Sequence, residues 1–163
     1  MSNPYTGAVA SALRKSQLLL DGETGPALRQ VAVQEGAVVQ LWRAYRAFLC
    51  ELAFQLQLGC EPESASELKE RAAARGTACA EAAELLELLG DPDSWLSQLQ
   101  AAWLQLWKFS GGKSEGNRGE DNLIPLQNLS AAEIPALSEE RLQAWRAALV
   151  ELVRRQRAHM EEW

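Results

Sequence analysis

The sequence is poor in the residues that most active sites and metal centres need. It has one histidine, His159, and three cysteines among 163 residues. No HExxH or CxxC spacing occurs, no serine or cysteine stands in a nucleophile-elbow sequence, and the glycines form no phosphate-binding loop. We therefore expect no enzyme activity, no metal site and no cofactor.

The cysteines and the hydropathy of the chain bear on its compartment. Cys50, Cys60 and Cys79 are odd in number and lack metal-ligand spacing, which argues against a disulfide framework and for a reducing compartment. No run of about 18 apolar residues is present, so no membrane-spanning segment is predicted. The N-terminus also lacks the basic-then-apolar pattern of a signal peptide. These absences predict a cytoplasmic protein.

Charge is moderate and uneven. The net charge of −6 argues against a general binder of nucleic acid or membrane surfaces. Residues 61–93 hold nine acidic and three basic side chains, and a basic cluster lies near the C-terminus at Arg154, Arg155 and Arg157. Two interpretations remain open. The two regions attract each other within the fold, or they form a dipolar surface for a charged partner.

A regular pattern between residues 26 and 58 predicts one long helix. Large or apolar residues recur there at alternating spacings of three and four, with Glu35 at the one polar position. They are Leu28, Val31, Val38, Trp42, Tyr45, Leu49, Leu52 and Leu56. At 1.5 Å per residue this helix would be roughly 50 Å long, so other helices are expected to pack along it.

Capping signals divide the rest of the chain into further helices. Asn3-Pro4 predicts one start, and Asp21-Gly22 the matching end. Later starts are predicted at Ser64, at Asp91-Pro92 and at Ser138; residues 66–89 fit either one helix or two, because Gly76-Thr77 interrupts them. We predict an all-α, up-down bundle of about five helices around residues 26–58, in one domain over residues 1–163.

Two segments before the last helix lack helical patterning. Residues 110–122 contain four glycines and no large apolar side chain, which predicts a flexible Gly-rich loop. Residues 123–137 are apolar but carry Pro125 and Pro135. This composition predicts an extended strap laid over the bundle.

Arg154 and His159 give the strongest catalytic suggestion. An arginine followed by four residues and a histidine on a late helix resembles the signature of the helical ribonucleases of the HEPN superfamily. That resemblance implies RNA cleavage by a pair completed across a dimer. The two residues lie about 140° apart around a regular helix, and the alternative is a surface arginine cluster beside a histidine at the rim.

Three residues are candidates for binding. Glu35 is the one charged residue on the long stripe, so it is either a polar centre in a small-ligand pocket or a residue where the stripe reaches the bundle edge. Most of the six tryptophans fall at helical spacing and are expected in the core. Trp107 and Trp163 are the two expected at the surface, where aromatic residues mark partner contacts.

Four stretches resemble a known family. They are Tyr5 with Thr6, residues 41–45, residues 91–96 and residues 142–146. Together they resemble a gammaproteobacterial family of small all-helical proteins that is known only as a domain of unknown function. The resemblance covers nearly the whole chain except the Gly-rich loop. It implies a helical fold and brings no catalytic residue, cofactor or partner.

The function predicted from these observations is that of a non-catalytic interaction protein. Such a protein would present a helix face or the 123–137 strap to a protein partner or to a second copy in a homodimer. The alternatives are an HEPN-like ribonuclease that uses Arg154 and His159, and a small-ligand bundle with Glu35 in its pocket.

Overall fold

A computed structural model describes residues 3–22, 25–109 and 136–161, and these residues form only helices, turns and loops. The six helices are α1 (Pro4–Leu20), α2 (Ala27–Gln55), α3 (Ala65–Ala74), α4 (Ala80–Gly90), α5 (Trp95–Leu106) and α6 (Glu139–Glu161). The prediction of an all-α bundle is confirmed.

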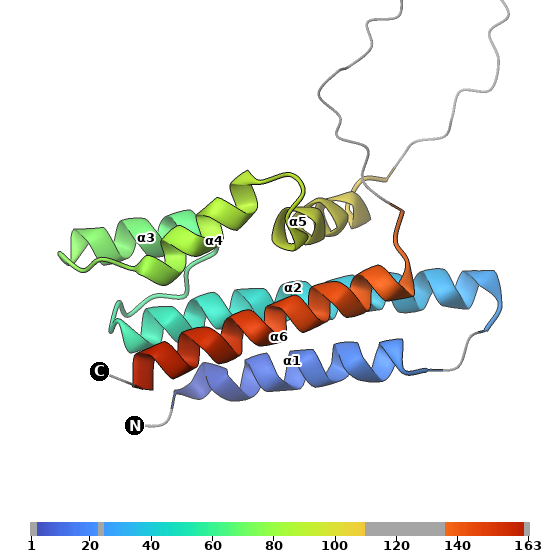
Figure 1. Ribbon diagram of the computed structural model, residues 1–163, viewed down its shortest axis with the longest axis horizontal. Coiled ribbons are helices and arrows are strands. Elements are labelled where there is room, and N and C mark those ends of the chain that lie inside the picture. The colour runs from blue at the N-terminus through green and yellow to red at the C-terminus, as the bar shows by residue number, and fades with distance from the viewer. Residues whose placement is uncertain (1–2, 23–24, 110–135, 162–163) are drawn as a thin grey trace, which may run out of the picture.

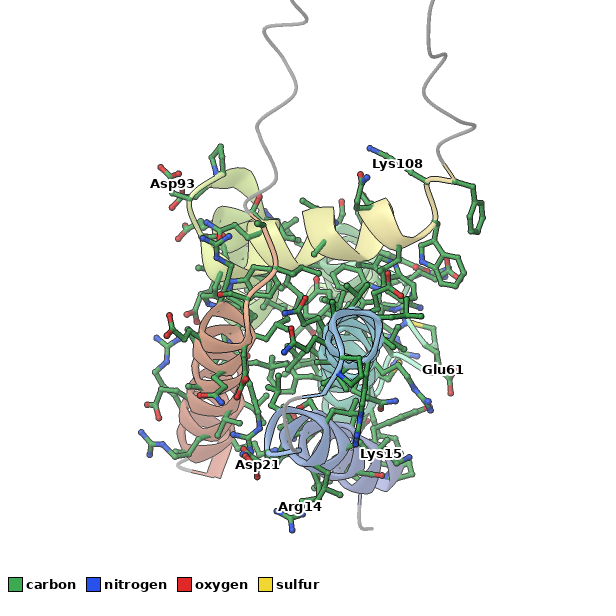
Figure 2. All side chains as sticks on the ribbon, turned by 90° about the vertical axis from the view of Figure 1, so that its right-hand side faces the viewer. Arg14, Lys15, Asp21, Glu61, Asp93 and Lys108 are labelled. Carbon is green, nitrogen blue, oxygen red and sulfur yellow. The ribbon has the colours of Figure 1, made fainter. Side chains whose placement is uncertain are left out.

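Helix α2 lies at the centre of the arrangement. Figure 1 shows α1, α2 and α6 side by side, with the shorter helices α3, α4 and α5 lying over them. Helix α1 runs antiparallel to α2, whereas α6 runs in the same direction as α2. Figure 2, which looks along the long helices, shows α5 lying across α2 and α6, with Asp93 at one end and Lys108 at the other. Helix α2 contacts α1, α3, α5 and α6, as its long apolar stripe predicts.

The long helix is shorter at its C-terminal end than the predicted range 26–58. Helix α2 ends at Gln55, and Gln57 adopts a left-handed φ of 54°. The backbone N–H of Leu58 then donates to the carbonyl of Ala53 at 2.9 Å, which is the hydrogen bond of a Schellman end. Glycine is the residue that usually takes the left-handed position after a helix. Because Gln57 takes it here, the sequence did not indicate that α2 ends at Gln55.

Residues 65–90 form two helices, which settles the alternative left open by the sequence. Ser64 caps α3 through the N–H of Glu67 at 3.1 Å, as its spacing predicts. Gly76, with φ of 72°, follows the C-terminus of α3. The interruption at Gly76-Thr77 would make Thr77 the next N-cap, but Cys79 takes that position instead, and its Sγ accepts from the N–H of Ala82 at 3.4 Å.

The predicted start of α5 at Asp91-Pro92 is also wrong, by three residues. Asp91 ends α4 and accepts from the N–H of Asp93 at 3.0 Å in a turn. Ser94 is the true N-cap: its Oγ accepts from the N–H of Ser97 and its hydroxyl donates to the carbonyl of Leu88. The buried Ser94 thereby ties the start of α5 to the end of α4.

Other predicted features agree with the structure. Asn3 caps α1 by accepting from the N–H of Tyr5 at 3.0 Å, and Ser138 caps α6 by accepting from the N–H of Arg141 at 3.2 Å. A glycine inside a long helix, such as Gly36, favours either a bend or a close helix contact. The structure shows the contact, because a Cβ added there would lie 3.3 Å from Cδ1 of Leu19 on α1.

Two predicted features lie wholly or largely outside the described residues. The Gly-rich loop at 110–122 is outside them, and so is the 123–137 strap except for Ala136 and Leu137. Leu137 is half-buried and packs against the core just before α6 begins. None of the helices described is long and apolar enough to cross a membrane.

Candidate functional site

One side of the N-terminal half of α2 is uncovered. We define the open face of α2 as Leu28, Val31, Ala32, Glu35, Val39 and Arg43, of which Val39 is half-buried and the others are exposed. At 100° per residue these six positions share an arc of about 120°. Leu28 is 82% exposed and Val31 is 48% exposed. The open face is therefore apolar at its N-terminal end and carries one charge of each sign.

The opposite side of the same helix is fully buried. Ala37, Leu41, Ala44 and Phe48 all have 0% exposure. They lie about 140° to 180° around the helix from Val39. Figure 2 agrees with this asymmetry, because α6 flanks α2 on one side and no described helix lies on the other. Helix α2 is thus central to the bundle without being enclosed by it.

An aromatic cluster borders the open face. Trp42 stacks on Trp103 of α5, with ring centroids 5.9 Å apart and an interplanar angle of 14°. Trp103 meets Trp107 edge to face at 5.2 Å. Because Trp42 is only about 60° from Val39 around α2, this cluster joins the end of α5 to the edge of the open face.

The end of α5 is itself apolar and exposed. Leu104 is 54% exposed, Trp107 is 57% exposed and Phe109 is 86% exposed. We call these three residues the aromatic end of α5, and we call them together with the open face of α2 the contact surface. Trp107 was predicted to be exposed and is; Trp163, the other tryptophan expected at the surface, lies outside the described residues.

Glu35 belongs to this surface. Its side chain is exposed, so the stripe of α2 has reached the bundle edge at that position. A hollow of about 330 Å³ beside the N-terminal half of α2 is lined by Leu18, Arg29, Val33 and Glu139 among others, but not by Glu35. The structure therefore gives Glu35 no role as the polar centre of a buried ligand site.

Arg154 lies at the surface of α6 and is engaged locally. Its Nη2 and Nε donate to the two carboxylate oxygens of Glu151 at 2.6 and 2.9 Å. This hydrogen bonding lowers the pKa of Glu151 and raises that of Arg154. His159 lies in α6, but its side chain is outside the described part of the chain.

The acidic and basic regions of the sequence meet within the fold. Arg155 of α6 pairs with Glu84 of α4, and Gln156 donates to the same carboxylate at 3.0 Å. This contact agrees with the interpretation in which the acidic and basic regions attract each other within the fold.

The structure contains a buried ion pair that was not predicted from the sequence. Glu51 on α2 is 1% exposed, and both of its carboxylate oxygens accept from Arg157 on α6, at 2.9 and 2.8 Å. Thr6 of α1 donates to the same carboxylate at 3.2 Å, and Asn3 donates to the backbone carbonyl of Glu51. This cluster ties three helices together, and since the carboxylate is satisfied, it fits a structural role.

A second hollow of about 340 Å³ lies beside the start of α1. It is lined by Tyr5, Phe54, Gly59, Cys60 and Glu61. The Tyr5 hydroxyl donates to Glu61 at 2.6 Å, and this hydrogen bond is the main cause that raises the pKa of Tyr5 to about 12. Within the described residues, no group of three or more histidine, cysteine or acidic side chains is arranged to hold a metal ion.

Comparison with known proteins places the chain in a family without giving it a function. Searches of curated proteins and of solved structures found no significant match. One family model matches residues 10–163, which is nearly the whole chain. The chain belongs to DUF6586, a family of unknown function.

Proposed function

We propose that this chain is a non-catalytic, cytoplasmic protein-interaction bundle that binds a protein partner through its contact surface. One observation carries the proposal. Large apolar side chains are exposed both on the open face of α2, at Leu28 and Val31, and on the aromatic end of α5.

Exposure of this kind is costly in water. Fully burying a large apolar side chain is worth about 1.5–3 kcal/mol, so a partner that covered Leu28, Trp107 and Phe109 would gain several such contributions. Single exposed apolar residues are common on protein surfaces, whereas contiguous apolar patches are typical of interaction sites. Tryptophan is also enriched among the residues that dominate binding energy at protein interfaces.

The remaining chemistry of the described chain supports the same proposal. Its most buried charge, Glu51, is already satisfied by Arg157 and Thr6. Its three cysteines are free, which supports a reducing compartment such as the cytoplasm.

Native mass spectrometry of the gently purified protein tests the proposal, with two matched leucine variants. Leu104 is 54% exposed on the contact surface, and Leu18 is 56% exposed on α1. We expect the wild type to retain the mass of another protein chain, either a second copy or a different protein. Leu104→Glu should lose that mass, because a carboxylate would be buried in the interface, and Leu18→Glu should keep it.

Two results would contradict the proposal. One is a retained small molecule in place of a protein, which would indicate a ligand pocket. The other is equal loss of the protein mass in both leucine variants, which would mean that the contact surface is not where the partner binds.

A further inference from the structure

We propose that the partner on the open face of α2 is a second copy of this chain. In the dimer, the α2 helices of the two copies lie antiparallel, and Glu35 of each copy faces Arg43 of the other. This inference rests on the proposed function and names the partner that it leaves open.

The two charges are available for such a contact. Glu35 and Arg43 are both exposed. In the parts of the chain that the structure describes, neither residue forms an ion pair, whereas Glu51, Glu67, Glu84 and Glu151 all do. Among the described residues, the open face of α2 thus presents one anion and one cation that have no ion-pair partner.

Their spacing matches the symmetry of a homodimer. Most homodimers have a two-fold axis, so the same surface of both copies meets itself. Glu35 and Arg43 stand four residues before and four residues after Val39. Each lies about 6 Å along the helix axis and about 40° around it from Val39, in opposite directions.

A two-fold axis at Val39 therefore brings both pairs of opposite charges to the same height, where their long side chains can meet across the interface. In an antiparallel pair with that axis, each position before Val39 lies opposite the position equally far after Val39 in the other copy. Glu35 then meets Arg43 of the second copy, and Arg43 meets its Glu35. Val39 packs against Val39, where a half-buried apolar side chain suits the centre of an interface.

The borders of the open face leave this side of α2 available. On one side, Gly36 is turned toward Leu19 of α1. On the other side, Trp42 stacks on Trp103 of α5. Between these two contacts, Ala32 and Glu35 are exposed and Val39 is half-buried.

Charge also favours a second copy over a strongly charged partner. The net charge of −6 opposes self-association, so a dimer contact needs a surface that does not add to this charge. Glu35 and Arg43 cancel, which makes the open face locally neutral. A strongly basic or acidic partner would leave one of these two charges facing a like charge, whereas a second copy pairs both.

Charge reversal tests the register of this dimer. In Glu35→Arg two arginines would face each other at both ends of the interface, and in Arg43→Glu two glutamates would. Two exposed ion pairs are lost in each single variant, and like-charge contacts replace them. We therefore expect each single variant to raise the dimer dissociation constant between about twofold and about thirtyfold. The double variant Glu35→Arg/Arg43→Glu restores both pairs with their signs exchanged, and should return to near the wild-type value.

The experiment is sedimentation velocity over a series of protein concentrations, with a matched control. Glu87 on α4 and Arg75 after α3 are exposed and lie outside the contact surface. Glu87→Arg and Arg75→Glu make the same charge changes there and should leave the dissociation constant unchanged. Circular dichroism of every variant confirms that a lost dimer is not a lost fold.

Each outcome decides the inference. Dimer loss in both single variants with recovery in the double variant supports it. A dimer that the single reversals leave intact, or that the double variant does not recover, overturns this interface. A wild type that stays monomeric at all concentrations overturns self-association. The proposed function is then tested separately, by whether native mass spectrometry detects a different bound protein.

Discussion

The two halves of α2 carry the same apolar stripe and have opposite surroundings. Tyr45, Leu49 and Leu52 in the C-terminal half are at most 1% exposed. Leu28 and Val31 in the N-terminal half continue that stripe at the same spacing and are 82% and 48% exposed. Apolar periodicity therefore identified the helix correctly and could not tell which part of it the chain itself would cover.

The difference between the halves comes from what lies over them. Helix α5 crosses α2 where Trp42 stacks on Trp103, and helix α3 packs on α2 as well. In the described structure no helix covers the first turns of α2 on that side, so the same residue types serve the core in one half and a surface in the other (Figure 1). An apolar stripe on a helix favours burial, and either the same chain or a second chain can bury it.

Truncating one apolar residue in each half gives the largest expected contrast. Phe48→Ala removes a ring that is 0% exposed, and should lower the free energy of unfolding by about 3–5 kcal/mol. Leu28→Ala should change it by no more than about 0.5 kcal/mol, because Leu28 is 82% exposed. Urea unfolding at dilute protein concentration measures both. A similar loss in both variants would mean that the open face is covered within the monomer.

The ion pair at the buried end of α2 should be nearly as sensitive. Arg157→Met leaves the Glu51 carboxylate buried without its partner, and should cost about 3–5 kcal/mol. Adding Glu51→Leu removes the stranded charge and should recover much of that loss. Denaturant unfolding of both variants measures this. If Arg157→Met left stability unchanged, the pair would be no more than a surface contact.

Thiol labelling compares the two halves directly. Cys50 lies in the buried half, and desolvation raises its pKa, so little reactive thiolate forms near pH 8. A cysteine introduced by Ala32→Cys on the open face should react with iodoacetamide much faster than Cys50. Labelling of Cys50 should increase as the pH rises toward its raised pKa, and unfolding should expose it fully. Peptide mass spectrometry assigns each site, and equal rates for the two thiols would remove the contrast between the halves.

The smallest expected effect concerns the C-terminal half of α6. If function resides in the contact surface, the protein should cleave no RNA, and His159→Ala should leave binding to its partner unchanged. A fluorogenic RNA assay with wild type and His159→Ala measures this. Cleavage that disappears in His159→Ala would establish the HEPN-like alternative instead.

Helix type and most capping residues were predictable because their signals are local. Asn3, Ser64 and Ser138 each cap the helix that follows them, as their side-chain chemistry favours. The start of α5 was not predictable from local signals, because Asp91 and Ser94 are both favourable N-cap residues. The choice depends on the bond between Ser94 and the carbonyl of Leu88, which is a contact with the preceding helix.

The candidate site was predictable only in part, for a similar reason. The sequence predicted that Trp107 is an exposed aromatic residue. It also singled out Glu35, but it did not decide whether Glu35 lies in a pocket or at the bundle edge. Glu51 was missed although it continues the buried side of α2 that holds Ala37, Leu41, Ala44 and Phe48, three residues after Phe48. A charge at such a position signals a buried pair, but its partner Arg157 lies 106 residues away and only the fold brings the two together.

Covalent footprinting at low and high protein concentration tests the central claim most directly. The claim is that a protein chain covers the uncovered side of α2. We predict that oxidative labelling of Leu28, Val39 and Trp107 falls as concentration rises, while labelling of Leu18 on α1 stays constant. Constant labelling of all four residues, in a sample that mass measurement shows to be dimeric, would place the dimer contact elsewhere and contradict the account.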